Sequence, residues 1–157
     1  IEKKNLLYIA TPFSYKAAEW LNKNNIKLFK IGSGETNNIP FIKYVCSFKR
    51  PMIVSTGMNS LQTVKKTVAI INKHKIPHVL LHCVNLYPTN YKLIRLNRMI
   101  EMKKIFKKSI IGYSDHTIGN TVSIDLIPNA QWTSMRLKIY CNPLAKYMMH
   151  LAVIQKF

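Results

Sequence analysis

The sequence predicts an α/β fold in which about five short parallel strands alternate with helices. Three observations predict it. Short apolar runs alternate with longer segments of helical period, each run is followed at once by small or polar residues, and no low-complexity linker interrupts the pattern. The chain has 157 residues, 48% of them hydrophobic, which is enough for one globular core.

Five apolar runs are the expected strands. They are short and rich in apolar or β-branched residues, as strands buried on both faces are. They span residues 6–10, 28–31, 52–54, 79–81 and 110–113. Because helical segments separate them, we expect a parallel sheet with crossover helices.

Four segments between these runs are expected to be helices. Ser14 can cap a helix that runs to about residue 24, and Asn59 or Ser60 can cap one that runs to about residue 73. A third helix is expected over 96–106, and a shorter one over 39–48 with Pro40 in its first turn.

Polar residues follow directly after the expected strands. The carboxyl ends of parallel strands meet at one edge, where barrels and open α/β sheets build their sites. The alternative is that such residues are loop formers and helix caps. The residues in question are Thr11, Ser33, Glu35, Ser55, Thr56, Asn85, Ser114, Asp115 and His116.

Charge and cysteine content bear on partners and compartment. The net charge of +18 is compatible with nucleic-acid binding, but the lysines are spread along the whole chain and no helix-turn-helix or RNP pattern accompanies them. A role in nucleic-acid binding is therefore disfavoured. No apolar stretch approaches the ~20 residues of a membrane span. Cys46, Cys83 and Cys141 are widely spaced and odd in number, which favours a reducing cytoplasm over a disulfide framework.

Taken together, the strand ends resemble the N-acylneuraminate (sialic acid) synthase family, which includes legionaminic and pseudaminic acid synthases. The resemblance covers residues 6–120 and rests on the order and spacing of short motifs. These are TPF at 11–13, KIGSGE at 30–35, STGM at 55–58, LHC at 81–83, NLYPT at 85–89 and GYSDHT at 112–117.

The resemblance implies a (β/α)8 TIM barrel, of which this chain would hold about five βα units. It also implies a divalent metal (Mn or Mg), a homodimer, and a small antifreeze-like domain at the C-terminus. The implied reaction joins C3 of phosphoenolpyruvate to the open-chain aldehyde of an N-acylhexosamine such as N-acetylmannosamine, with release of phosphate.

Site residues can be named from the chemistry and from the resemblance. Lys30 lies within an apolar strand, where an ammonium group is costly without an anionic partner; the alternative is that it reaches the surface. The resemblance implies that Glu35 and His116 are catalytic, that Glu35 faces the sugar and Tyr87 contacts it, and that His116 binds the metal. It also implies phosphate or carboxylate contacts for a further set of residues: Thr11, Ser33, Ser55, Asn85 and Ser114.

Other polar residues receive different interpretations. Asp115 could orient loop amides or simply cap a turn. His82 is expected to support the barrel interior, while His74 and His78 are expected to face solvent. Cys83 is interpreted as a small buried hydrophobe rather than a nucleophile.

The chain also departs from the family pattern. Residues 1–120 would form a partial barrel without its first two βα units. Residues 121–157 read as a divergent tail with no clean periodicity, the antifreeze-like domain is not found, and Leu137 stands where a second metal-binding His is expected. We hypothesise a frameshift or truncation near residues 121–125. The alternative function is then an inactive fragment that at most binds phosphoenolpyruvate or associates with an intact synthase.

Overall fold

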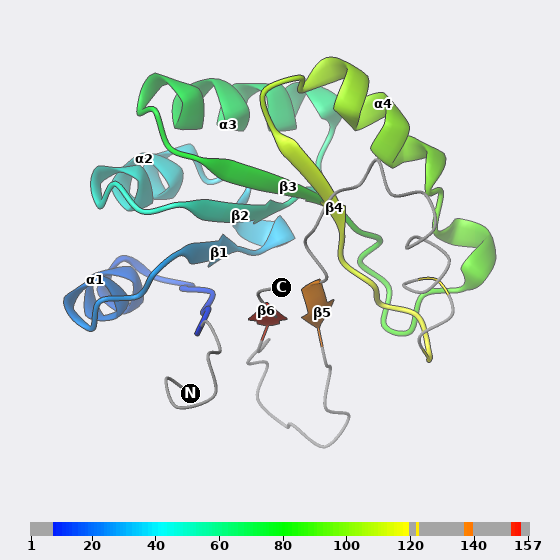
Figure 1. Cartoon of the computed structure of the whole chain (residues 1–157), viewed down its shortest axis with the longest axis horizontal. Helices are drawn as coiled ribbons and strands as arrows, with labels where there is room; N and C mark the ends of the chain where they lie inside the picture. The colour runs from blue at the N-terminus through cyan, green and yellow to red at the C-terminus, as the bar shows by residue number, and fades with distance from the viewer. Residues whose placement is uncertain (1–7, 120–121, 123–136, 140–151, 155–157) are drawn as a thin grey trace.

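A four-stranded parallel sheet, in the order β1-β2-β3-β4, forms the centre of the molecule. The computed structural model describes residues 8–119, 122, 137–139 and 152–154 (Figure 1). The strands are β1 (Phe29–Ile31), β2 (Met52–Ser55), β3 (His78–His82) and β4 (Ile110–Tyr113). Neighbours in chain order are neighbours in the sheet, as in one segment of a (β/α) barrel.

A helix follows or precedes each strand, and the helices cover one face of the sheet (Figure 1). They are α1 (Tyr15–Lys23), α2 (Ile39–Ser47), α3 (Leu61–Lys73) and α4 (Asn97–Ile105), with short 3₁₀ turns η2 (Ser33–Glu35) and η3 (Tyr91–Leu93). Ser14 and Ser60 cap α1 and α3: their hydroxyl oxygens accept hydrogen bonds from the main-chain amides of Ala17 and Thr63. The helices predicted from the sequence are therefore confirmed to within a residue or two at their ends.

The first predicted strand differs from expectation. Of residues 6–10, Leu6 and Leu7 lie outside the described part, and only Ala10 joins the sheet, through a single parallel bridge to Phe29. The Ala10 carbonyl accepts the Lys30 amide at 3.0 Å. The described sheet thus has four strands and a one-residue start of a fifth.

The structure describes a small part of the predicted tail. A short antiparallel pair, β5 (Leu137–Ile139) and β6 (Ala152–Ile154), forms a sheet of its own. Its three-residue strands are too short for alternation to show in the sequence. The Leu137 position discussed above lies at the start of β5.

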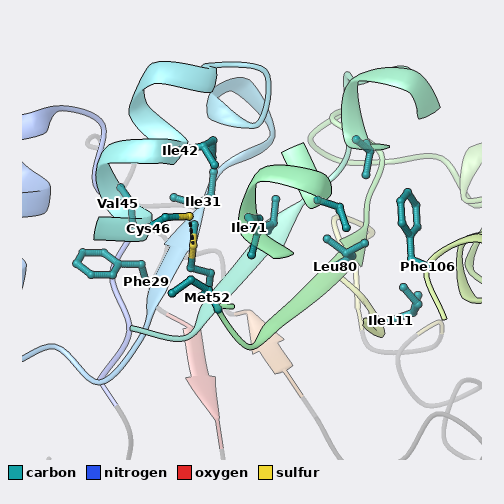
Figure 2. Close-up of a cluster of buried hydrophobic side chains, with 14 of the residues drawn as sticks. Phe29, Ile31, Ile42, Val45, Cys46, Met52, Ile71, Leu80, Phe106 and Ile111 are labelled. Carbon is teal, nitrogen blue, oxygen red and sulfur yellow. Dashed lines mark hydrogen bonds between the residues drawn. The ribbon is translucent and has the colours of Figure 1, made fainter. Parts of the chain in front are cut away.

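The two faces of the main sheet bury different residues. The helix-facing side packs Phe29, Ile31 and Val54 against α2 and α3, as Figure 2 shows for part of this core. The opposite face carries a smaller buried cluster of Ile9, Leu28, Ile53, Val79 and Leu81. Burial on both faces explains why the strands are short apolar runs without alternation.

Helices α1 and α3 end in the same way, through a residue in left-handed conformation. After α3, Lys75 has φ 57°, its amide bonds the Asn72 carbonyl, and the Ile76 amide bonds the Ile71 carbonyl. Asn25 plays the same part after α1. This double bond pattern is the Schellman motif, which usually employs Gly at the left-handed position.

Replacing Lys75 by Gly is therefore expected to stabilise the protein by about 0.5–1 kcal/mol, because the Cβ penalty of the left-handed conformation disappears. Lys73→Gly, two residues earlier in the last helical turn, is the matched control and should destabilise by about 0.5–1 kcal/mol. Urea unfolding of both variants checks the opposite signs. Equal losses of stability would show that the Lys75 conformation carries no strain.

Two further findings concern membranes and thiols. Within the described residues, none of the helices has the length and apolarity that crossing a bilayer requires. Cys46 and Cys83 are both free and buried, and burial raises the pKa of the Cys46 thiol to about 11. Cys141 lies outside the described residues.

Candidate functional site

Most of the predicted site residues lie on the loops beyond the carboxyl ends of β1, β3 and β4, while Lys30 and Ser55 lie within β1 and β2 and Thr11 precedes α1. Two groups of contacts form there. One joins the loops after β1, β2 and β3, and the other joins the loops after β3 and β4. The segment that follows β3 contributes to both.

The first group is centred on Cys83. Its Sγ lies 3.2 Å from Ser33 Oγ and 3.5 Å from Asn85 Oδ1. Gly57 lies so close that a Cβ built there would come within 2.8 Å of the Cys83 Sγ and 2.9 Å of the Cys83 carbonyl. Ser33 and Asn85, predicted from distant parts of the sequence, are therefore brought together around one thiol.

The second group is centred on His116. Its Nδ1 donates to the Val84 carbonyl, which can only accept, so the proton of the neutral imidazole is assigned to Nδ1. Nε2 is left as an acceptor, with Ser114 Oγ and Tyr87 Oη each 3.2 Å away. The Tyr87 ring stacks on the imidazole at a centroid distance of 4.2 Å. Three predicted residues thus meet at one nitrogen.

Lys30 and Ser55 lie on the sheet face opposite the helices. Phe29 and Ile31 pack into the helix-side core. Lys30, between them, pairs in register with Ile53, which belongs to the smaller buried cluster on the opposite face of the sheet. Lys30 is only 5% exposed, which argues against the alternative that it reaches the surface. Ser55, two residues beyond Ile53, is buried on the same face at the end of β2.

Thr11 and Glu35 lie at the same end of the sheet. The Thr11 hydroxyl is the one fully buried side-chain polar atom of the described residues that lacks a hydrogen-bond partner. A buried hydroxyl without a partner is costly, and a bound ligand is one way to satisfy it. Glu35 accepts a hydrogen bond of 2.8 Å from Asn38 Nδ2, which holds its carboxylate within the turn after β1.

Several interpretations of other polar residues are resolved by their contacts. Asp115 accepts from the amide and hydroxyl of Thr117, so it caps its turn. His82 is on the helix-facing side rather than in the barrel interior: Nε2 donates to the Ile94 carbonyl at 2.7 Å, and burial lowers its pKa. His78 is not simply solvent-facing, because its Nε2 bonds Ser109 Oγ at 2.8 Å.

Among the described residues, His116 presents a nitrogen atom that is oriented to bind a divalent metal. His116 Nε2 is oriented by the bond from Nδ1 to a main-chain carbonyl, the arrangement that metal-binding histidines use. No cluster of three or more His, Cys, Asp or Glu side chains suited to an ion occurs in the described part of the chain. The described residues therefore do not by themselves form a complete site for a divalent metal.

Comparison with known proteins agrees with the motifs and the fold. The NeuB family model matches residues 1–128. The chain belongs to the NeuB family. It is 34% identical over 126 residues to the N,N'-diacetyllegionaminic acid synthase of Campylobacter jejuni, covering 78% of this chain and 37% of that protein. It is 32% identical over 123 residues to human N-acetylneuraminate-9-phosphate synthase, covering 78% and 34%. The chain thus spans about a third of the length of these curated relatives.

Solved structures agree with the family assignment and with the fold. The N-acetylneuraminic acid synthetase of Leptospira borgpetersenii superposes with a TM-score of 0.75 at 33% identity, over 77% of this chain and 42% of that chain. A truncated 3-deoxy-D-arabino-heptulosonate 7-phosphate synthase from Thermotoga maritima superposes with a TM-score of 0.59 at 14% identity, which supports the fold alone. The predicted partial (β/α) barrel is confirmed.

Three residues at this edge were not predicted as site residues. Gly57 belongs to the STGM motif at residues 55–58, but no role was predicted for it. A glycine directly after a strand nevertheless indicates that another backbone segment approaches closely. Thr36 and Asn59 bind main-chain carbonyls of neighbouring loops. Which carbonyl a polar loop residue reaches depends on strand order, and no sequence pattern encodes it.

Proposed function

We propose that this chain belongs to a synthase that condenses phosphoenolpyruvate with an N-acylated amino sugar to give a nonulosonic acid and phosphate. The names of its relatives, sialic, legionaminic and pseudaminic acid synthases, support the substrate class. The observation that carries the proposal is the convergence of Ser33, Asn85, Ser114 and His116 at the carboxyl ends of adjacent parallel strands.

Phosphoenolpyruvate binding is assigned to residues in and beside β1 and β2. Lys30 offers a cation in a site of low dielectric, and hydroxyls of Ser33, Ser55 and Thr11 offer short donors to phosphate or carboxylate oxygens. The partnerless Thr11 hydroxyl supports this assignment, because an anion oxygen would satisfy it. Gly34 leaves open space beside them, with no heavy atom within 4 Å of a Cβ built on it.

Sugar binding is assigned to Tyr87 and His116, which follow β3 and β4, and to Glu35, which follows β1. In the proposed reaction C3 of phosphoenolpyruvate forms a bond to the aldehyde carbon, water adds at C2, and the C2–O bond breaks to release phosphate. The His116–Tyr87 pair can bind the aldehyde oxygen or a sugar hydroxyl, while Glu35 can orient the sugar or the water.

A second candidate is a fragment that binds phosphoenolpyruvate without turnover. One observation favours it: the described residues hold no group of three or more His, Cys, Asp or Glu side chains that could bind a metal ion. On this view the anion-binding half of the site assembles while the metal and sugar half does not.

Phosphate release from phosphoenolpyruvate distinguishes the two candidates. Purified chain is incubated with Mn and N-acetylmannosamine, beside His116→Ala. The synthase proposal expects sugar-dependent release that falls at least about 100-fold in the variant. Phosphoenolpyruvate binding by calorimetry without any release supports the binding fragment. Absence of both binding and release contradicts both candidates.

A further inference from the structure

Ser33 and Ser55 stand at the ends of adjacent strands, and each has its carbonyl held by the other strand's loop. Thr36, after β1, donates its hydroxyl to the Ser55 carbonyl at 2.7 Å. Asn59, after β2, donates its amide to the Ser33 carbonyl at 2.8 Å. We name this pair of bonds the loop clasp. Its two halves run in opposite directions, so each loop is tied to the other.

The loop clasp lies beyond the end of the hydrogen-bonded ladder between β1 and β2. The β1–β2 ladder ends at the pair Ile31 and Val54, before either serine. Beyond that point, ladder pairing between β1 and β2 does not set the position of Ser33 relative to Ser55. The side chains of Thr36 and Asn59 provide a direct connection between the two segments there.

The clasp is anchored in the buried core. Thr36 and Thr67 are both fully buried, and Thr67 Oγ1 on α3 donates to the Thr36 carbonyl at 2.6 Å. Asn59 also donates to the Gly57 carbonyl at 2.6 Å, which holds its amide plane in place. Buried hydrogen bonds of this kind tolerate little displacement, because an unpaired group left behind is costly.

We infer that Thr36 and Asn59 are positioning residues that set the spacing between the Ser33 and Ser55 hydroxyls for one bound anion. The identity of that anion as phosphoenolpyruvate rests on the proposed function, while the clasp itself does not. Neither residue needs to touch the ligand. Their effect on binding comes through the two carbonyls that they hold.

Thr36→Val tests the inference, since it keeps the shape of the side chain and removes the donor. Thr36→Ser is the matched control, because it keeps the hydroxyl and removes the methyl group. We expect Thr36→Val to weaken phosphoenolpyruvate binding about tenfold, because the two serines are no longer held at a fixed spacing, and Thr36→Ser to stay within about twofold. Calorimetry measures affinity, and amide chemical shifts report where the backbone moves.

The shifts give a readout that does not depend on the ligand. Thr36→Val should move the amides of residues 55–58 in the partner loop, and Asn59→Ala should move those of 33–35. Unchanged affinity, or shifts confined to each variant's own loop, would overturn the inference. Equal losses in Thr36→Val and Thr36→Ser would also overturn it, because the methyl group and not the hydroxyl would then matter.

A wild-type chain that does not bind phosphoenolpyruvate contradicts the proposed function and leaves the clasp to be decided by the amide shifts alone. Should Thr36→Val fail to fold, the half-buried Asn59 supplies the decisive variant. Asn59→Ala must then move the amides of 33–35, or the inference is wrong.

Discussion

Gly57→Ala adds a single methyl group and is expected to disrupt the candidate site severely. A Cβ at this position would lie 2.8 Å from Cys83 Sγ and 2.9 Å from the Cys83 carbonyl, and closer still to the Asn85 side chain. Because all three of these atoms belong to the segment that follows β3, either the loop after β2 or this segment must move. We expect the free energy of unfolding to fall by about 2–3 kcal/mol, as overpacking in a dense region does.

Binding should fall with stability in this variant. Displacing Cys83 and Asn85 also displaces Ser33, which touches the Cys83 thiol, so phosphoenolpyruvate affinity is expected to drop more than about tenfold. Urea unfolding and calorimetry measure the two effects.

Gly34→Ala is the matched control for this variant. It lies one residue from Ser33, and no heavy atom lies within 4 Å of its added Cβ. Its stability should change by no more than about 0.5 kcal/mol. If Gly57→Ala were equally harmless, the tight approach of the β2 and β3 loops would not exist.

Lys30→Met is expected to weaken phosphoenolpyruvate binding strongly. The variant keeps a long apolar side chain in β1 and removes the buried charge. Phosphoenolpyruvate affinity should fall about 100-fold, since a buried cation facing an anion is worth several kcal/mol when one partner is removed. Urea unfolding of the ligand-free variant measures the effect of the same substitution on the free energy of unfolding.

Lys43→Met, on the exposed surface of α2, controls for the loss of one positive charge from a chain of net charge +18. It should leave affinity within about twofold at moderate salt. Wild-type affinity in Lys30→Met would remove Lys30 from the anion site. A large loss of stability in that variant would instead assign Lys30 a structural role.

The order of strands and helices could be predicted because each element carries its own local signal. Ser14 and Ser60 accept helix amides only at a helix start, and apolar runs of strand length can be buried only in a sheet covered on both sides. Strand ends then share one edge by topology, so the location of the site followed from the same pattern. The motif resemblance added the chemistry, which periodicity does not contain.

Other features depended on contacts between segments far apart in the chain. Lys75 occupies a left-handed position that usually favours Gly, because the buried Ile71 and Ile76 hold the helix end together. The assignment of His82 to the helix-facing side followed from which way the strand pleat turned. Neither could be read from composition or spacing.

By itself, then, the sequence of this NeuB-family chain determined its α/β class, its element order and the edge at which polar residues collect. The tertiary structure alone decided which of those residues meet: Ser33 with Cys83, His116 with Tyr87, and the loop clasp through Thr36 and Asn59. The physical reason is the distance along the chain over which each interaction acts. Caps and hydrophobic periods act over a few residues, whereas the loops after neighbouring strands are joined by hydrogen bonds whose partners only the packed sheet brings within reach.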